Sequence, residues 1–438
     1  MSILSHQEAA LRSFCLQTLG CASNQADSQI MEGLLSGSGY VSEKDPSNAL
    51  VLLLNTCYVK RPTEDRVVNR IKALRSSFPG KPLVVAGCMV EIDPAKLEKI
   101  APESCWVGPH RVDRIVEACD AAIAGRVVRF TGRQFLVKPS LSVSTKSPVI
   151  DIVQIAEGCL GACSYCCTRF ARGHLSSYPV ESIVSRVRGS LSSGHKEIWF
   201  TAQDTAAYGT QGKESLPTLL RRVCSIPGRF LIRVGMMNPG TADRVLSPLV
   251  STFENEKVFK FVHLPVQSGS DGILGMMRRG YDVDVFRRVV ASFRARIPRV
   301  TLSTDVIVGF PGEARSDFAQ TVSLIEEIRP DILNISRFFP RPRAEASALP
   351  RLGAEELKAR SRRLHGLHRS IALESNQRWV GWRGRVLVDE AGKGQTWICR
   401  NYAYKPIVVA FPRRLVGRFV EVEVCDARPT YLLGTVLA

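Results

Sequence analysis

The chain has 438 residues, of which 45% are hydrophobic and 23% are charged. This length is too great for one ordinary core, so two or three domains are expected. No run of about 18 or more apolar residues occurs, which excludes a membrane-spanning helix. Residues 1–14 lack the basic and then apolar layout of a secretory signal. We therefore expect a cytoplasmic protein with no membrane partner.

Positive charge is in clear excess, because 59 Lys and Arg face 41 Asp and Glu and give a formal net charge of +18. Such an excess favours a polyanionic partner, and nucleic acid is the first candidate. A solvated basic surface explains the charge equally well. The 13 cysteines are an odd number in a chain expected inside the cell, which argues against a disulfide framework. Metal or cluster ligation, or simple burial, is favoured instead.

The first part of the chain alternates short apolar runs with amphipathic ones. Buried parallel strands are predicted by FCLQTLG, ALVLLLNT and PLVVAGC, and helices by the spacing at 25–36 and 64–76. This pattern predicts a small doubly wound α/β domain over residues 11–125. Residues 126–148 are rich in Ser, Lys and Pro and are predicted to form a linker.

A second series of strands and helices begins near residue 149. The predicted helices include 180–192, 284–296, 316–328 and 354–376, and the six predicted strands begin near Asp151, Glu197, Phe230, Val258, Val300 and Asp331. Such a series predicts a partial (β/α)6 TIM-like barrel over residues 149–375. Residues 376–438 contain short strands with no helix between them, which predicts a small antiparallel β-barrel.

Three cysteines form the motif C-x3-C-x2-C just after the first predicted strand of the barrel. Cys159, Cys163 and Cys166 lie in AEGCLGACSYCCTRFARG, and their thiolates could bind three irons of a [4Fe–4S] cluster and leave the fourth iron open. Structural zinc takes four ligands, and no matching fourth ligand is spaced for it. Cys167 follows directly, and we interpret it as a bystander. The motif and its place at the C-terminal end of a strand resemble the radical S-adenosylmethionine (SAM) superfamily.

Three further cysteines, Cys21, Cys57 and Cys88, each follow an apolar strand of the first predicted domain. Parallel strands end on one edge of a sheet, so these thiols are expected to converge there and to bind a second cluster. Three separately buried cysteines are the alternative. Burial is the expectation for the cysteines without such placement, which are Cys15, Cys105, Cys119, Cys224, Cys399 and Cys425.

The three parts together resemble the methylthiotransferase family, which joins a three-cysteine α/β domain, a radical SAM barrel and an RNA-binding β-barrel called the TRAM domain. The last part resembles TRAM through CRNYAYKPIVVAF and YLLGTVL. The segments EGCLGACSYC, FARGHLSSYPVE, KEIWFTAQDTAAYG and FVHLPVQSGSD are most similar to the archaeal and eukaryotic branch. The archaeal members are the closer match, because the chain shows no C-terminal membrane anchor of the kind that eukaryotic members carry.

The resemblance implies an activity and its cofactors. That branch converts N6-threonylcarbamoyladenosine, next to the tRNA anticodon, to its 2-methylthio form. Two [4Fe–4S] clusters and two molecules of SAM are implied, one SAM as methyl donor and one as radical source. Cys159, Cys163 and Cys166 would hold the SAM-cleaving cluster, and the other triad the sulfur-carrying cluster. The implied partners are tRNA, an electron donor such as a ferredoxin or flavodoxin, and a sulfur donor.

Further site residues are implied at the C-terminal ends of the barrel strands. Cofactor contacts are expected from Gln203, Asp204, Gln267, Ser268, Gly309 and Glu313, and substrate contacts from Arg337, Arg400 and Lys405. Each could instead serve a turn, a cap or packing. Residues 341–385 hold eleven Lys and Arg against four Glu, and Trp379, Trp382, Tyr402 or Tyr404 could stack on bases or fill a core.

The chain departs from the family after the sixth strand, where RPRAEASA stands in place of the usual RPGTPA. Arg343 replaces a Gly and Glu345 a Pro, which puts the local loop conformation in question.

Two alternatives remain open at this point. One is methylthiolation of isopentenyl-adenosine in tRNA or of an aspartate in a ribosomal protein. The other is an iron–sulfur RNA-binding protein without turnover.

Overall fold

The computed structural model describes residues 12–212 and 214–437. Leu11 and Ala438, at the ends of the predicted first and last domains, lie outside the described residues, as does most of the stretch examined for a secretory signal. Contacts divide the described chain into two units. The first holds the residues up to Lys146 together with Phe170–Arg172, and the second holds the rest. Within the described residues, no helix has the length and apolar character needed to cross a bilayer.

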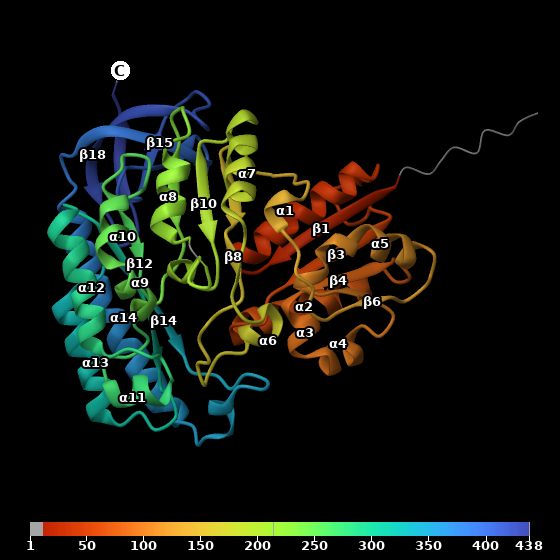
Figure 1. Ribbon diagram of the computed structural model, residues 1–438, viewed down its shortest axis with the longest axis horizontal. Helices are drawn as coiled ribbons and strands as arrows, with labels where there is room; N and C mark the ends of the chain where they lie inside the picture. The colour runs from red at the N-terminus through yellow and green to blue at the C-terminus, as the bar shows by residue number, and fades with distance from the viewer. Residues whose placement is uncertain (1–11, 213, 438) are drawn as a thin grey trace, which may run out of the picture. The chain divides into compact units, whose positions relative to one another are not determined.

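The first unit is built on a six-stranded parallel sheet in the order β2-β1-β3-β4-β5-β6. Its strands are β1 (Ser13–Leu19), β2 (Val41–Ser42), β3 (Val51–Thr56), β4 (Leu83–Gly87), β5 (Cys105–Val107) and β6 (Arg129–Phe130). Its helices are α1 (Ala22–Gly37), α2 (Arg61–Ser77), α3 (Cys88–Ile92), α4 (Pro94–Ile100) and α5 (Ile115–Ile123), with short 3-10 turns η1 (Pro109–Arg114) and η2 (Lys138–Ser140). Helices α1 and α5 cover one face, and α2, α3 and α4 lie on the other (Figure 1).

Burial on both faces explains why the central strands read as continuous apolar runs. Every residue of β3 and β4 is buried. Helix α2 begins with Pro62 in its first turn and buries Val67, Ile71 and Leu74, a helical spacing that directs one stripe at the sheet. The expectation of an α/β first domain is confirmed.

Part of the predicted linker takes part in this unit. β6 (Arg129–Phe130) pairs with β5 at the sheet edge. Farther on, Lys138 is buried and its ammonium group lies 2.7 Å from a carboxylate oxygen of Asp27. Residues 126–148 therefore include an edge strand and a buried cation, which their polar composition did not indicate.

The second unit begins with six parallel strands. β7 (Ile150–Gln154), β10 (Glu197–Thr201) and β11 (Leu231–Val234) form one sheet, and β12 (Phe261–His263), β13 (Thr301–Val308) and β14 (Ile332–Arg337) form the other. A bridge between Ile232 and Val258 joins the two. β12 starts at Phe261, later than predicted, because Val258 makes this isolated bridge and no continuous ladder. The partial (β/α)6 barrel is confirmed.

Helices run along the outside of these strands (Figure 1). They are α7 (Val180–Ser192), α8 (Leu216–Cys224), α9 (Pro239–Arg244), α10 (Leu246–Phe253), α11 (Asp271–Met276), α12 (Val283–Arg296), α13 (Arg315–Ile328) and the long α14 (Ala354–Gln377). Short elements complete the barrel: β8 (Ala156–Glu157), β9 (Ser176–Ser177), η3 (Thr205–Ala207) and η4 (Glu345–Ala348). The residues of α6 (Thr168–Arg172) are divided, because Phe170–Arg172 belong to the first unit.

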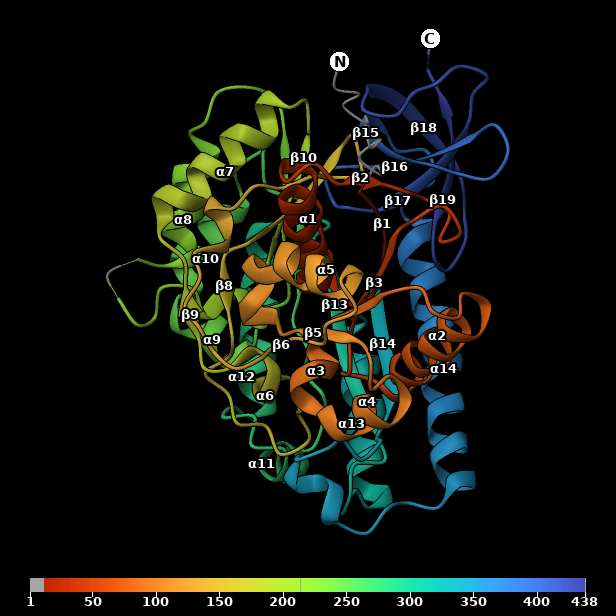
Figure 2. The same cartoon turned by 90° about the vertical axis from the view of Figure 1, so that its right-hand side faces the viewer.

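A closed five-stranded barrel follows α14 (blue in Figure 2). Its strands are β15 (Arg383–Ala391), β16 (Thr396–Arg400), β17 (Pro406–Ala410), β18 (Phe419–Ala427) and β19 (Leu432–Val436). All neighbours are antiparallel except β17 and β19, which are parallel. A closed ring with an odd number of strands must contain one such pair, so the barrel is antiparallel as far as closure allows.

The loop that departs from the family keeps a backbone suited to glycine. Arg343 stands where the family has Gly, and its φ is +64°, in the left-handed region. The chain therefore turns as a glycine would, at the cost of some strain in an arginine. Glu345 begins η4 and pairs with Arg278 at 2.6 Å.

The free energy of unfolding of the first unit is expected to fall by about 3 to 5 kcal/mol in Asp27→Asn. The buried cations Lys138 and Arg172 each lie 2.7 Å from the Asp27 carboxylate. The substitution removes its negative charge and leaves both cations buried without it. Hydrogen exchange at the amides of β3 and β4 in the full chain measures this free energy. The control Asp65→Asn breaks the exposed pair with Arg61 and should cost about 1 kcal/mol at most. Equal losses in both variants would contradict the role of burial.

Candidate cluster and cofactor sites

Cys21, Cys57 and Cys88 follow three adjacent strands of the first unit. The strands end in register, because Leu19 pairs with Thr56 and Thr56 with Gly87. The pKa of Cys57 is raised to about 12, mainly by burial and to a smaller extent by the nearby thiols of Cys88 and Cys21. Burial likewise raises the pKa of Cys88. The structure thus brings the three thiols together at one sheet edge.

An asparagine pair braces this edge. Asn24 accepts a hydrogen bond from the Cys21 thiol at 3.3 Å and donates to the carbonyl of Thr56 at 2.9 Å. Asn55 donates to the Asn24 carbonyl at 2.7 Å. Gly87 has a φ of +93°, and a Cβ there would lie 2.3 Å from the Asn55 side chain. Glycine before the third cysteine is therefore required by the asparagine network. Sequence reasoning missed both asparagines, although Asn24 stands three residues after Cys21.

The donor set at this edge fits an iron–sulfur cluster. Thiolates are the ligands of such clusters, and in a cubane each thiolate binds a different iron. No group of three or more His, Cys, Asp or Glu among the described residues is arranged around a single metal ion. At a one-ion site all ligands reach one centre, which is not required of the thiolates of a cluster. Cluster binding would also deprotonate thiols whose pKa burial has raised.

The loop with Cys159, Cys163 and Cys166 follows β8 in the second unit. Gly158 has a φ of +81°, and a Cβ there would lie 2.0 Å from the His174 carbonyl oxygen. The loop needs glycine at this point for that reason. The sulfurs of Cys159 and Cys163 both lie near Gly161, because a Cβ on that residue would be 3.5 and 3.6 Å from them. The two thiols therefore face the same space.

Exposure separates the three motif cysteines from their neighbour. Cys159, Cys163 and Cys166 are partly exposed, whereas Cys167 is buried. This pattern favours the three C-x3-C-x2-C cysteines as the ligands, and Cys167 as a buried side chain that packs in the core. Burial raises the pKa of Cys159 to about 11, and Asp204 and the other two motif thiols add to the shift while the Gly161 amide opposes it. Burial also raises the pKa of Cys166. The donor set again fits a cluster.

Most of the remaining cysteines are buried, as predicted. Cys15, Cys105, Cys119 and Cys399 are buried, and Cys224 is partly buried. Cys425 is exposed on β18, so the expectation of burial was wrong for it. On the antiparallel barrel, alternate residues of a strand face solvent, and Cys425 falls on that face.

Gln203 and Asp204 lie just after β10, as predicted, and the side chains of both accept hydrogen bonds from backbone amides. The Gln203 side chain accepts a hydrogen bond from the Gly158 amide at 2.7 Å, so it anchors the start of the cluster loop. Asp204 accepts from the Asn238 amide at 3.0 Å and the Thr241 hydroxyl at 2.7 Å. Burial raises the pKa of Asp204, and these donors oppose the shift.

Gln267 and Ser268 lie after β12. Gln267 has a φ of +75° and bridges to Val306, which marks a tight turn at the strand end. Ser268 is buried and accepts a hydrogen bond from the Ser270 amide at 3.2 Å. Its side chain therefore serves the turn.

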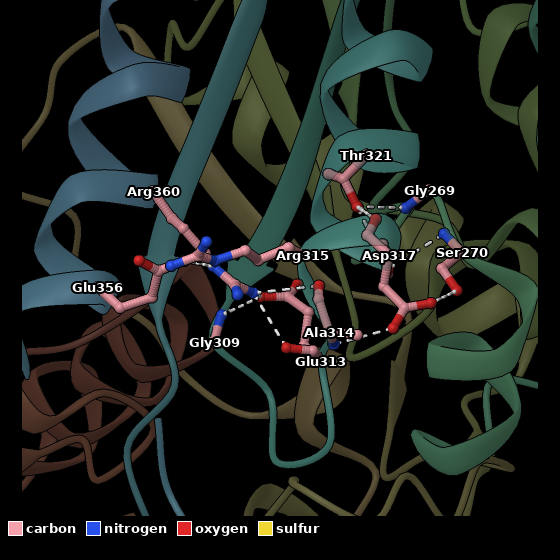
Figure 3. Close-up of polar contacts among 11 residues, drawn as sticks. Gly269, Ser270, Gly309, Glu313, Ala314, Arg315, Asp317, Thr321, Glu356 and Arg360 are labelled. Carbon is pink, nitrogen blue, oxygen red and sulfur yellow. Dashed lines mark hydrogen bonds and ion pairs between the residues drawn. The ribbon is translucent and has the colours of Figure 1, made fainter. Parts of the chain in front are cut away.

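Gly309 and Glu313 lie after β13 and are joined to α14 (Figure 3). Glu313 is buried, accepts from the Gly309 amide at 2.8 Å, and pairs with Arg360 at 2.8 Å. Burial raises the pKa of Glu313, and Gly309 and Arg360 oppose the shift. These contacts use the carboxylate to fix the loop after β13, which the sequence did not indicate because Arg360 lies far along the chain.

The three predicted substrate contacts differ in their exposure to solvent. Arg337 is exposed at the end of β14. Arg400 and Lys405 require correction, because both are engaged inside the fold. Arg400 pairs with buried Asp389 at 3.0 Å, and Lys405 is buried and pairs with Asp331 at 2.7 Å.

Burial alone would raise the pKa of Asp331, but Lys405 lowers it below its usual value. Arg400 and Lys405 therefore hold the small barrel together and to its neighbours, and they do not present charge to a phosphate. Among the aromatic candidates, Trp379 and Tyr404 are buried, whereas Tyr402 is 37% exposed and Trp382 is partly exposed.

Arg279 and Tyr281, which sequence reasoning passed over, lie beside the cluster loop. The guanidinium of Arg279 donates to the Cys163 sulfur at 3.4 Å and to the Tyr281 hydroxyl at 3.1 Å. The segment MRRGY that contains them has two adjacent arginines after a short helix, a signal too common to identify a site by itself.

Comparisons with known families match all three parts of the chain. Residues 13–108 match a family described as Uncharacterized protein family UPF0004. Residues 153–325 match the Radical SAM superfamily, and residues 377–437 match the TRAM domain.

Curated relatives match nearly the whole chain. A protein of Methanothermobacter thermautotrophicus, named probable threonylcarbamoyladenosine tRNA methylthiotransferase, is 48% identical over 96% of this chain and 98% of its own. A Pyrococcus abyssi protein of the same name is 40% identical over 97% of this chain and 99% of its own. The Homo sapiens threonylcarbamoyladenosine tRNA methylthiotransferase is 35% identical over 96% of this chain and 73% of its own.

Solved structures share the fold at low identity. The radical SAM methyltransferase TsrM from Kitasatospora setae, with cobalamin and a [4Fe–4S] cluster bound, superposes with a TM-score of 0.57 at 14% identity. The match covers 77% of this chain and 74% of TsrM. From the family matches and the curated relatives, the chain belongs to the threonylcarbamoyladenosine tRNA methylthiotransferase family of radical SAM enzymes.

Proposed function

We propose that this enzyme adds a methylthio group to C2 of N6-threonylcarbamoyladenosine next to the anticodon of tRNA. The observation that carries the proposal is the 48% identity with an archaeal protein of that name over 96% of the chain. The order of the three parts and the two cysteine triads support it. Its cofactors are SAM and [4Fe–4S] clusters.

When bound, these cofactors supply the methyl group, the sulfur and the radical chemistry that an inert aromatic C–H bond requires. Cys159, Cys163 and Cys166 would hold the SAM-cleaving cluster, and Cys21, Cys57 and Cys88 the sulfur-carrying one. Gln203 fixes the start of the loop with Cys159 through the Gly158 amide. The Asn24 and Asn55 pair fixes the sheet edge that carries Cys21, Cys57 and Cys88.

The surface cations of the small barrel would bind the tRNA backbone. Arg413, Arg414 and Arg418 are exposed on the segment between β17 and β18. Exposed basic residues also line one stripe of α14, where Lys358, Arg362 and Arg369 recur at helical spacing. Such cations neutralise phosphates and give binding that weakens with salt.

The chemistry also needs an electron source and a sulfur source. We assign these roles to a ferredoxin- or flavodoxin-like protein and to a separate sulfur donor, and we place the enzyme in the cytoplasm, where the tRNA substrate is found.

Mass spectrometry of tRNA nucleosides tests the substrate directly. After incubation with the reconstituted enzyme, SAM and a reductant, tRNA should contain the 2-methylthio form of N6-threonylcarbamoyladenosine. A methylthio group on isopentenyl-adenosine, or no methylthio nucleoside at all, would contradict the proposed substrate.

Adjacent cysteines provide a matched test of the cluster loop. Cys166→Ala should reduce the formation of 5′-deoxyadenosine to background and lower the iron content from about eight to about four atoms per chain, because one cluster loses a ligand. Cys167→Ala should keep both values, since Cys167 is buried beside the motif. Loss of SAM cleavage in Cys167→Ala with retention in Cys166→Ala would reassign the ligand.

Removal of two barrel cations should weaken tRNA binding and flatten its salt dependence. For the double variant Arg413→Gln and Arg414→Gln, the negative slope of log affinity against log salt should become shallower by about 1 to 2. The control is Arg383→Gln with Arg385→Gln, whose cations already pair with Glu423 and Glu421. Filter binding over a salt series measures the slope. A larger change in the control than in the test variant would refute this contact surface.

A further inference from the structure

The turn after α11 lies directly against the cluster loop in the second unit. Ser164, between two motif cysteines, donates its hydroxyl to the Met276 carbonyl at 2.8 Å and its amide to the Met277 carbonyl at 3.2 Å. The short helix ends there, and Arg278 and Gly280 take left-handed backbone conformations, with φ of +55° and +71°. The turn therefore holds the loop by its backbone and places the side chain of Arg279 next to it.

Arg279 is fixed on several sides at once. Its guanidinium donates to the Cys163 sulfur at 3.4 Å, the Tyr165 hydroxyl at 3.2 Å and the Pro265 carbonyl at 3.2 Å. The remaining contact is to the Tyr281 hydroxyl at 3.1 Å. Tyr281 is held in turn, because its hydroxyl lies 3.0 and 2.9 Å from the carbonyl oxygens of Pro265 and Val266.

The neighbouring arginine shows that this placement is specific. Arg278 points to solvent, where its side chain is 57% exposed and pairs with Glu345. Arg279 alone of the two faces the cysteine loop. A guanidinium remains protonated in proteins, so its positive charge beside Cys163 is permanent.

A fixed cation at a ligand sulfur has a defined electrostatic effect. A [4Fe–4S] cluster gains one negative charge when it accepts an electron from an external one-electron donor. A nearby positive charge and a hydrogen bond to the ligand sulfur stabilise that reduced state more than the oxidised state. The reduction potential then rises, which matters because SAM cleavage begins from the reduced cluster.

We propose that Arg279 is a positioning residue of the SAM-cleaving cluster, which holds the Cys163 sulfur and raises the reduction potential of the cluster. The inference rests on the proposed function, since it takes Cys163 as a cluster ligand. Tyr281 supports the same task by fixing the guanidinium.

A redox titration of the reconstituted full chain tests the proposal. Replacement of Cys21, Cys57 and Cys88 by Ala leaves one cluster, so that electron paramagnetic resonance during a dithionite titration reports that cluster alone. In this background the variants are Arg279→Gln, Arg279→Lys and Tyr281→Phe, with Arg278→Gln as the matched control.

At a fixed potential, the ratio of reduced to oxidised cluster should fall about tenfold in Arg279→Gln, which for one electron corresponds to about 59 mV. Arg279→Lys keeps the charge and should recover part of the shift. Tyr281→Phe should show a smaller shift, and Arg278→Gln none.

Several results would overturn the inference. One such result is an unchanged reduction potential in Arg279→Gln at full iron content. If SAM binding is weaker while the reduction potential is unchanged, Arg279 would be assigned to SAM binding instead. If Arg279→Gln does not assemble the cluster, an unchanged reduction potential in Tyr281→Phe would overturn the inference. If the background protein itself assembles no cluster, the ligand assignment of Cys163 in the proposed function fails, which is a separate outcome.

Discussion

The triad of Cys21, Cys57 and Cys88 depends on one constraint, which is that parallel strands carry their C-terminal ends to the same edge of a sheet. In the first unit the pairs Leu19–Thr56 and Thr56–Gly87 align three strand ends, and one cysteine follows each. In the second unit the three motif cysteines share one loop after β8, and the same constraint brings Gln203, which follows the parallel strand β10, to the Gly158 amide of that loop. Thiols separated by about thirty residues in sequence can then act as one donor set, as the spacing of Cys21, Cys57 and Cys88 shows.

Several polar side chains at or near the strand ends already have structural partners. Asp204 holds the turn at Asn238, and Glu313 pairs with Arg360 of α14. Lys405 pairs with Asp331 at the start of β14. Since a buried charge without a partner is costly, each of these contacts fixes the geometry of a loop. These contacts hold loops at the strand ends of the second unit in fixed positions, which suits chemistry that depends on position.

The fold and the cysteines could be predicted from the sequence because their signals are local. Apolar runs with strand or helix spacing gave most elements to within a few residues, and C-x3-C-x2-C lies within eight residues of chain. The partners of charged side chains could not be predicted in this way. Glu313 meets Arg360 across 47 positions, and Lys405 meets Asp331 across 74. Arg400 and Lys405 therefore looked like phosphate contacts, whereas Arg279, which touches the Cys163 sulfur, had no local signal.

The central claim is that the two triads do different work, and a single substitution separates them. Cys57→Ala should leave the formation of 5′-deoxyadenosine from SAM intact, because the motif loop of the second unit is unchanged. The same variant should give no methylthiolated nucleoside in tRNA, since the second triad is incomplete. Both products can be measured by mass spectrometry in one reaction. Retention of the methylthiolated nucleoside in Cys57→Ala at the rate of the unaltered enzyme would contradict the account.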